Sequence, residues 1–454
     1  MQTIYANELL AGLTLAEPVP VTAVVTDSRK VQPGCVFVCF AGERVDGHDF
    51  AAAAYQNGAV YIIANHPVPG VPENRTVLVQ DSALAMVRMA SNYRMLFSPR
   101  MIGVTGSVGK TTTKEFCYAV LSAFGNTLKT EGNQNNDIGV PNTLFRLTAD
   151  TEYAVVEMGM DHAGEIERLT RCARPSAAII TMIGVSHLEN LGTRENILKA
   201  KMEICAGLPD GAPLVLNADN DLLPTAKVPP RLRAVWFGID APEADVRALD
   251  ITTVAGGTRF TLADAEHGRF AVSIPTVGRH TVYDALAAYT AATRLGLDPA
   301  RCAAALSRYQ ATGMRQHIVE KGGITFIEDC YNASPDSMKA ALSVLKALPN
   351  ARKIALLGDM LELGGASEEG HRHTGEWAAD AGIDALIAYG PRSAAMAEAA
   401  KAHGVAAVHC QTAEEVLQYV RQFVRPGDAV LVKASHSMGL EQLLQEYYKE
   451  LPQG

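Results

Sequence analysis

The sequence predicts an α/β protein of three domains, and three observations carry that prediction. Its 454 residues are about three times the length of a typical domain. Short apolar runs alternate with helical patterns, which is typical of parallel sheets. Breaks at Ser98-Pro99 and at Thr312-Gly313 divide the chain into domains 1–97, 98–313 and 314–454.

Composition and charge exclude several classes of protein. Hydrophobic residues make up 48% and charged residues 20%, which excludes a disordered chain, a collagen and a coiled coil. A net charge of −9 argues against broad binding to nucleic acid or to an anionic membrane. The chain has no apolar run of 18 residues and no basic leader, so we expect no membrane insertion. Eight scattered cysteines without a C-x-x-C pair are typical of reduced thiols, so we expect a cytoplasmic protein.

The first two domains are predicted from apolar runs and helical patterns. In the first domain, we expect strands at 35–40, 59–64 and 76–80 and helices at 49–59 and 82–97. In the second, we expect strands at 101–106, 153–159, 177–184 and 213–219, with a helix at 111–125. Short β-like runs between about 232 and 275 predict a small antiparallel addition, and a helix follows at 281–296.

The alternation of strands and helices restarts after Gly313. Apolar runs at 324–330, 353–359, 385–390 and 429–435 are each followed by an Ala-rich helical stretch. This pattern predicts a Rossmann-like third domain.

The strongest chemical signal is a glycine-rich segment that follows one strand and opens a helix, from Gly103 to Thr112. Small residues there allow backbone N–H groups to approach phosphate oxygens, and the helix N-terminus adds a favourable field. Lys110 supplies a cation, and the Thr111 hydroxyl can bind Mg²⁺. Val104 stands where the usual pattern has its first glycine, so an ordinary glycine-rich turn is the alternative.

Three further features of the second domain are candidates for ligand binding. The amide-rich segment 133–141 can hydrogen-bond phosphate or sugar, although alone it is typical of a polar turn. Glu157 ends an apolar strand, where a carboxylate can bind Mg²⁺ beside a phosphate loop or simply be solvated. His187 also follows an apolar strand, and a lone histidine there is more often a packed or surface residue.

Lys199 and Lys201 lie on a predicted helix that is typical of a solvated face. A lysine can also react with CO₂ to give a carbamate, which is an oxygen ligand for a metal.

In the third domain a polar cluster, residues 328–336, lies between a strand and a helix. It is also typical of a turn with a helix N-cap. Arg315, shortly before this cluster, can reach a phosphate from this domain. Segment 358–364 also follows a strand directly, as the polar cluster does. Lys433 ends the last strand and can present a cation to a carboxylate.

Together these motifs resemble the Mur ligase family, over nearly the whole chain and in order. The segments that carry the resemblance are TGSVGKTTTKE, NQNNDIGVP, AKMEI, DCYNASPDSM and GDMLELG, with the strand ends at Glu157 and His187. The N-terminal segment 26–50 resembles the UDP-binding domain of that family.

The resemblance implies a fold and an activity. It implies an N-terminal UDP-sugar domain, a central ATPase domain and a C-terminal domain that closes over ATP. The activity would be an ATP-dependent amide ligation through an acyl phosphate, with UDP-N-acetylmuramoyl-tripeptide and D-alanyl-D-alanine as substrates, in a monomer. GDMLELG and the absence of a D-N-P-R motif favour the dipeptide over diaminopimelate or lysine as the group added.

The resemblance also implies roles for individual residues. The catalytic residues would be Lys110, His187 and a carbamylated Lys201. Two Mg²⁺ ions would be held by Thr111 with Glu157 and by His187 with Lys201. ATP would contact Gly106, Ser107, Gly109, Lys110, Thr111, Thr112, Asn136, Arg315, Asp329, Tyr331 and Asn332. The substrates would contact Asp27, Ser28, Arg29 and Lys433.

The sequence departs from the family pattern at four positions and leaves other functions open. Thr281 and Asp284 stand where the family usually has two asparagines, and Ala434 and His436 stand where glycine and arginine are more usual. The alternatives are another Mur-like amide ligase, such as a folylpolyglutamate synthetase, and a P-loop NTPase switch that makes no bond.

Overall fold

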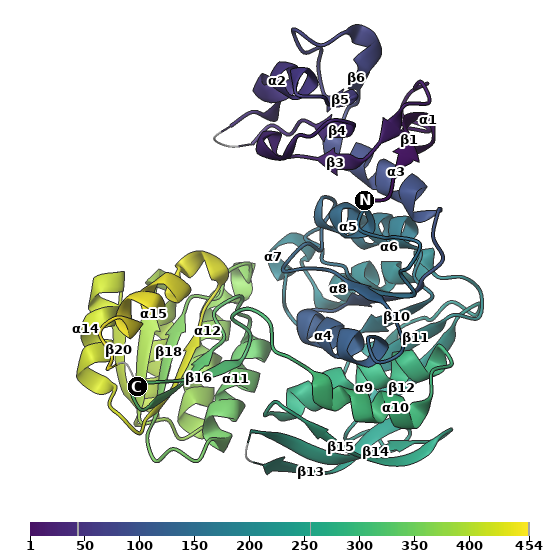
Figure 1. Ribbon diagram of the computed structural model, residues 1–454. Helices are drawn as coiled ribbons and strands as arrows, with labels where there is room; N and C mark the ends of the chain where they lie inside the picture. Colours follow the sequence, from purple (N-terminus) through teal and green to yellow (C-terminus); the bar gives the residue numbers. More distant parts are fainter. Residues whose placement is uncertain (43–44, 255, 453–454) are drawn as a thin grey trace.

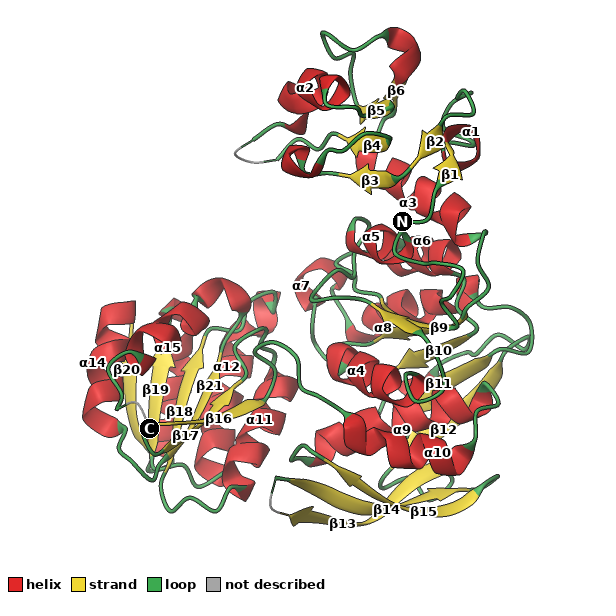
Figure 2. Ribbon diagram, in the orientation of Figure 1, coloured by secondary structure: helices red, strands yellow, loops and turns green. Residues whose placement is uncertain are grey.

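The computed structural model describes residues 1–42, 45–254 and 256–452. Within them the chain forms three α/β bodies, each with a sheet of its own (Figures 1 and 2). The predicted three-domain α/β architecture is therefore confirmed. No described helix is both long enough and apolar enough to span a bilayer.

The N-terminal body has a four-stranded parallel sheet and a short hairpin-like pair. The sheet contains β3 (Ala23–Val25), β4 (Cys35–Val38), β5 (Tyr61–Ala64) and β6 (Thr76–Leu78), and the pair contains β1 (Ile4–Tyr5) and β2 (Pro20–Val21). The helices are α1 (Ala6–Leu9), α2 (Ala51–Gln56) and α3 (Ser82–Arg94). Asp81 fixes the start of α3, because its side chain accepts hydrogen bonds from the N–H groups of Ala83 and Leu84.

The central body contains one nine-stranded sheet. Its strands, in spatial order, are β15 (Gly268–Ile274), β14 (Gly257–Asp264), β13 (Val246–Val254), β12 (Arg233–Gly238), β11 (Pro213–Asn217), β10 (Ala177–Ile180), β7 (Arg100–Thr105), β9 (Tyr153–Glu157) and β8 (Thr127–Lys129). The strands from β8 to β13 are parallel, and β14 and β15 are antiparallel. The predicted antiparallel addition exists, but it continues the central sheet, because β12 pairs in parallel with both β11 and β13.

Helices cover both faces of this sheet. They are α4 (Lys110–Leu121), α5 (Gly139–Leu144), α6 (Glu165–Ala173), α7 (Leu188–Leu191), α8 (Arg194–Met202), α9 (Arg279–Arg294) and α10 (Pro299–Ala305). Helices α4 and α9 share one apolar cluster with the sheet, while α5 and α6 belong to another. Strand β7 lies between β9 and β10: the chain runs from β7 to β8 on one side, and it later crosses from β9 to β10 on the other side of β7. That topological switch point is where open α/β sheets bind ligands, at the carboxyl ends of the strands.

The C-terminal body has a six-stranded sheet in the order β16 (His317–Lys321), β17 (Ile324–Glu328), β21 (Ala429–Lys433), β18 (Lys353–Gly358), β19 (Ala385–Tyr389) and β20 (Ala406–Cys410). All pairs except β16 with β17 are parallel. The flanking helices are α11 (Pro335–Ala347), α12 (Ser367–Asp380), α13 (Ala394–Ala402), α14 (Ala413–Phe423) and α15 (Leu440–Tyr448). Ser334 and Ser337 form a capping box at the start of α11, which fixes the polar loop that precedes it.

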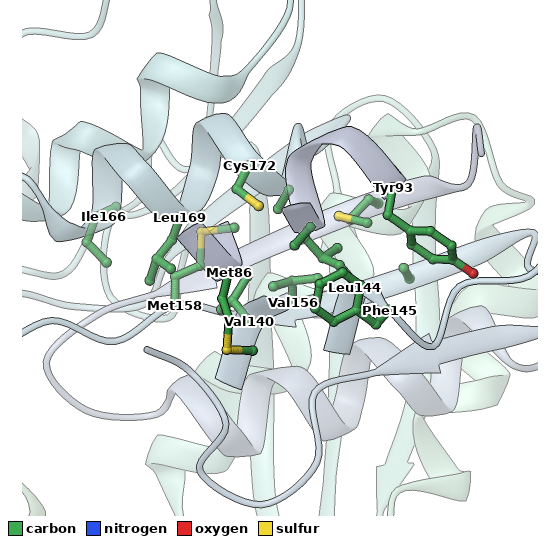
Figure 3. Packing of buried hydrophobic residues seen from close by; sticks show 14 of the residues in the cluster. Met86, Tyr93, Val140, Leu144, Phe145, Val156, Met158, Ile166, Leu169 and Cys172 are labelled. Carbon is green, nitrogen blue, oxygen red and sulfur yellow. The ribbon is translucent and has the colours of Figure 1, made fainter. Parts of the chain in front are cut away.

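The N-terminal body rests on the central one through α3. Figure 3 shows Met86 and Tyr93 of α3 among side chains of α5, α6 and β9. The Tyr93 hydroxyl donates a hydrogen bond to the Leu147 carbonyl (2.7 Å) and accepts one from the Gln2 N–H (2.7 Å). This buried hydroxyl therefore ties three distant segments together.

We expect Tyr93→Phe to lower the free energy of unfolding by about 1–3 kcal/mol, because it leaves a buried carbonyl and a backbone N–H without their partner. Urea unfolding followed by tryptophan fluorescence and circular dichroism measures the change. Tyr5→Phe is the control, because the Tyr5 side chain is 53% exposed. Equal stability of the two variants would contradict the assignment.

Candidate active site

The loop between β7 and α4 is shaped to surround an anion. Gly109 has a φ of 88°, which favours glycine, and a Cβ there would lie 2.6 Å from Asp284 Oδ1. The Lys110 side chain folds back over the loop, and its ammonium group donates a hydrogen bond to the Gly106 carbonyl (2.9 Å). Burial lowers the pKa of Lys110, so a bound anion would stabilise its charge. The backbone and the lysine together fit a polyphosphate.

Glu157 is the centre of a buried polar cluster beside this loop. Its side chain is 1% exposed and accepts hydrogen bonds from the Thr111 hydroxyl (2.9 Å) and the Asn135 amide (2.8 Å). Lys114 Nζ lies 3.7 Å from Glu157 Oε2 and 3.2 Å from Glu115 Oε1. The Thr111 hydroxyl and the Glu157 carboxylate are neighbouring hard oxygen donors, which suits Mg²⁺.

Three side chains that could bind a metal ion lie together where the central and C-terminal bodies meet. His187 Nδ1 lies 3.1 Å from Asp161 Oδ1 and 3.3 Å from Glu362 Oε2, and the three residues offer one ligand atom each within 4.8 Å. Glu362 belongs to the loop after β18, so two domains contribute. His187 and Glu362 both have a φ of 64°, in the left-handed region, so the backbone holds both side chains in an uncommon conformation.

Lys201 lies on α8 behind the cavity wall. Its side chain is fully buried, and its Nζ has no hydrogen-bond partner among the described residues. Burial lowers its pKa well below the ordinary value, and the charge of Lys110 lowers it further. This environment favours the neutral amine. Lys199, two residues earlier on the same helix, is exposed.

The C-terminal body presents cations and aromatic rings to the same space. The Arg315 guanidinium lies 4.1 Å from the centre of the Tyr331 ring. Lys433 Nζ donates to Asp329 Oδ2 (2.7 Å) and to the Asn332 carbonyl (2.8 Å). Lys433 therefore shapes the loop that follows β17 in addition to facing the cavity.

These groups line one cavity of about 790 Å³ between the central and C-terminal bodies. Most of the residues predicted for the site are on its wall: Ser107, Gly109, Lys110, Thr112, Asn136, Glu157, His187, Arg315, Asp329, Tyr331, Asn332 and Lys433. Gly106, Thr111 and Lys201 lie behind that wall. Asn136 also fixes the local backbone, because its Oδ1 accepts a hydrogen bond from the Gly139 N–H (2.9 Å) at the start of α5.

The predicted UDP-contacting residues are not part of this cavity. Asp27 accepts hydrogen bonds from the Arg29 backbone N–H (3.0 Å) and from its guanidinium (2.8 Å), which lowers the pKa of Asp27 to about 2. Ser28 and Arg29 form the 3₁₀ turn η1 (Ser28–Lys30), and the Arg29 side chain is 87% exposed. They lie on the N-terminal body.

Sequence reasoning missed four residues of the site. Asn135 and Lys114 hold Glu157, and Asp161 and Glu362 surround His187. A signal existed for two of them, because Asn135 belongs to the amide-rich segment and Glu362 to GDMLELG. The alternation of helix and strand gives no reason to place Asp161 beside Glu362.

A phosphate loop with oxygen ligands at a switch point, faced by a second α/β domain, defines a P-loop nucleotide enzyme. Three family models match the chain: the Mur ligase family catalytic domain at 20–94, the Mur ligase middle domain at 104–292, and the Mur ligase glutamate ligase domain at 314–436. The chain belongs to the Mur ligase family, and the predicted resemblance is confirmed.

Similar proteins span nearly the whole chain. The UDP-N-acetylmuramoyl-tripeptide–D-alanyl-D-alanine ligase of Bacillus subtilis is 39% identical, covering 97% of this chain and 96% of its own. A crystal structure of MurF from Acinetobacter baumannii has a TM-score of 0.89 at 29% identity and covers 99% of both chains. A MurF ligase from Thermotoga maritima in complex with ADP has a TM-score of 0.84 at 30% identity, covering 95% of this chain and 98% of its own.

We expect Lys110→Ala to weaken ATP binding by roughly 30- to 150-fold, the equivalent of one charge-assisted contact of about 2–3 kcal/mol. Titration calorimetry with ATP and Mg²⁺ measures the change. Lys227→Ala removes an exposed lysine outside the cavity and serves as the control. Wild-type ATP affinity in Lys110→Ala would refute the phosphate-loop assignment.

Proposed function

We propose that this chain is an ATP-dependent amide ligase that adds D-alanyl-D-alanine to UDP-N-acetylmuramoyl-tripeptide in peptidoglycan precursor synthesis. The observation that carries the proposal is the single cavity in which the phosphate loop, its oxygen ligands and the loops of the C-terminal domain meet. The full-length relatives that are named for this reaction support it.

The reaction has two steps on the substrates. The free carboxylate of the tripeptide attacks the γ-phosphorus of ATP, so that a P–O bond to ADP breaks and an acyl phosphate forms. The amine of the dipeptide then attacks the acyl carbon, loses a proton, and inorganic phosphate leaves. Both steps bring anions together, so the protein's task is to hold and neutralise them. Lys110 and the loop N–H groups do this for the transferred phosphoryl group.

Two metal positions fit the donor sets of this chain. Thr111 and Glu157 would hold one Mg²⁺, and His187 together with Lys201 as its carbamate would hold the other. Mg²⁺, when bound, would neutralise charge on the phosphate oxygens. Asp161 and Glu362 stand close enough to His187 to orient its ring or to complete the second position.

Carbamylation of Lys201 fits its environment. A neutral amine attacks CO₂, an N–C bond forms and the released proton passes to water. The buried, unpartnered Nζ of Lys201 favours the neutral amine. The carbamate supplies an oxygen ligand that binds Mg²⁺, at a position where a protonated lysine would repel the ion.

The remaining domains supply the substrates and exclude water. Arg315, Asp329, Tyr331 and Asn332 would contact ATP from the C-terminal domain, and Lys433 would face a substrate carboxylate. Closure of that domain would protect the acyl phosphate from hydrolysis.

The N-terminal domain would bind the UDP group through Asp27, Ser28 and Arg29.

One chain lines both sides of the cavity, so we expect a monomer. Its eight buried free thiols are consistent with work in the reducing cytoplasm.

Phosphate release is the experiment that tests the function. We expect release from ATP only when UDP-N-acetylmuramoyl-tripeptide and D-alanyl-D-alanine are both present. A folylpolyglutamate-type ligase would release no phosphate with these two substrates, because it needs a different acceptor. An NTPase switch would release phosphate in the absence of both substrates. Either result would refute the proposal.

We expect Lys201→Ala to lower the ligase rate by roughly 100-fold or more, because a metal ligand is lost. A short carboxylate such as acetate at high concentration should restore part of the rate, by supplying the missing oxygens.

Lys199→Ala is the matched control and should be nearly neutral, because Lys199 points to solvent from the same helix. Full activity of Lys201→Ala, or carboxylate rescue of Lys199→Ala instead, would exclude the carbamate at Lys201.

A further inference from the structure

Asp284 is a buried carboxyl group that lies directly against the phosphate loop. It projects from α9, is 6% exposed and lines the cavity. Its Oδ1 accepts a hydrogen bond from the Thr113 hydroxyl of α4 (2.8 Å). The same oxygen stands 2.6 Å from where a Cβ of Gly109 would be. Asp284 therefore touches the turn of the loop that opens α4, where the phosphates would bind.

Among the described residues, no cation compensates the charge of Asp284. Within the part of the chain that the structure describes, it forms no salt bridge, and the only group that favours its charged form is Thr113. The two lysines of α4 nearest the loop are directed elsewhere: Lys110 to the Gly106 carbonyl and Lys114 to Glu115 and Glu157.

Three further described groups that face Asp284, namely Cys117, Tyr309 and Thr181, carry no positive charge. Cys117 comes from α4, and Tyr309 follows the turn η6 (Leu306–Arg308); burial raises the pKa of both, so both are neutral. Thr181, directly after β10, lies near the same part of Gly109, since its Cβ is 3.6 Å from where a Cβ of Gly109 would be. Burial without a cation raises the pKa of Asp284 to about 7.

We propose that Asp284 is a positioning residue that lets the phosphate loop accept a nucleoside triphosphate only while its carboxyl group carries a proton. The proposal rests on the proposed function, because it takes ATP as the ligand of the loop. In the neutral form the carboxyl adds no charge beneath the loop. In the ionised form a carboxylate with no counterion lies beside the polyphosphate, and the two anions repel each other in a partly desolvated site.

The sign of the pH dependence follows from this arrangement. ATP binds the protonated form better, so its affinity is highest below pH 7 and falls as the carboxyl ionises. For a group that titrates near 7, the apparent dissociation constant should rise roughly tenfold from pH 6 to pH 8. The free protein should show the matching effect, because a raised carboxyl pKa makes stability fall as pH rises between about 4 and 7.

The test measures ATP dissociation constants by calorimetry at pH 6, 7 and 8, with Mg²⁺ and without the other substrates. Asp284→Asn keeps the shape of the side chain but cannot ionise. The pH dependence of ATP and Mg²⁺ themselves is common to both proteins, so the ratio of wild-type to D284N constants isolates the carboxyl. We expect that ratio to rise roughly tenfold. A ratio that stays constant would overturn the proposal.

Thr113→Val provides a second, independent variant. It removes the hydrogen bond that favours the ionised carboxyl, so the loss of ATP affinity should move to higher pH. An unchanged midpoint in T113V would overturn the proposal even if D284N did not fold. The ligase reaction is tested separately by phosphate release at pH 7. Its failure would refute the proposed function without changing the pH ratio of ATP binding.

Discussion

The site depends on the burial of one carboxylate, Glu157, at the end of β9. A buried carboxylate is tolerated only when it is paired and hydrogen-bonded, and here two segments supply its partners, the phosphate loop with α4 and the amide-rich segment. Thr111 comes from the phosphate loop, Asn135 from the amide-rich segment and Lys114 from the next turn of α4. Because the Thr111 hydroxyl and the Asn135 amide both donate to the Glu157 carboxylate, the loop, the amide segment and β9 are fixed relative to one another. The phosphate loop thus acquires its shape before any ligand arrives.

The charges of the cavity are divided between two domains. The central body supplies Lys110, Glu157 and His187, while the C-terminal body supplies Arg315 and Glu362. Neither domain alone presents a complete set of groups for a nucleotide and a second substrate. A reaction that must exclude water suits this division, because closing the two domains together would both complete the site and cover it.

The sequence predicted the strands and glycine loop well because apolar runs and glycine positions follow local rules. The runs at 35–40 and 59–64 match β4 and β5, and the helix expected at 111–125 matches α4. Strand β13 lies within the region 232–275 but has no apolar run of its own, because Arg247 and Asp250 interrupt it and a bulge at Asp250 (φ 54°) breaks its register. The continuity of the nine-stranded sheet was missed for a different reason, since strand pairing such as that of Pro213 with Arg233 leaves no local mark in the sequence.

The site residues also fall into two groups, those that have a local signal in the sequence and those that have none. Lys110 and Glu157 were predicted because each occupies a characteristic position relative to a strand end. Asp161 and Glu362 were not, because their proximity arises from the packing of two domains whose arrangement no local pattern encodes. Lys201 was proposed from resemblance, and only the structure revealed that its amine is buried without a partner.

The continuous central sheet has a mechanical consequence. Helix α9 packs against β11, β12 and β13 on one side and against α4 on the other. A distortion introduced at the antiparallel edge, far from any ligand, would be transmitted through this rigid helix to the turn that begins α4. The three outer strands, β13, β14 and β15, therefore support the phosphate loop mechanically through α9. Exchanging them between relatives would alter the stiffness of the nucleotide site without changing a single residue that contacts the nucleotide.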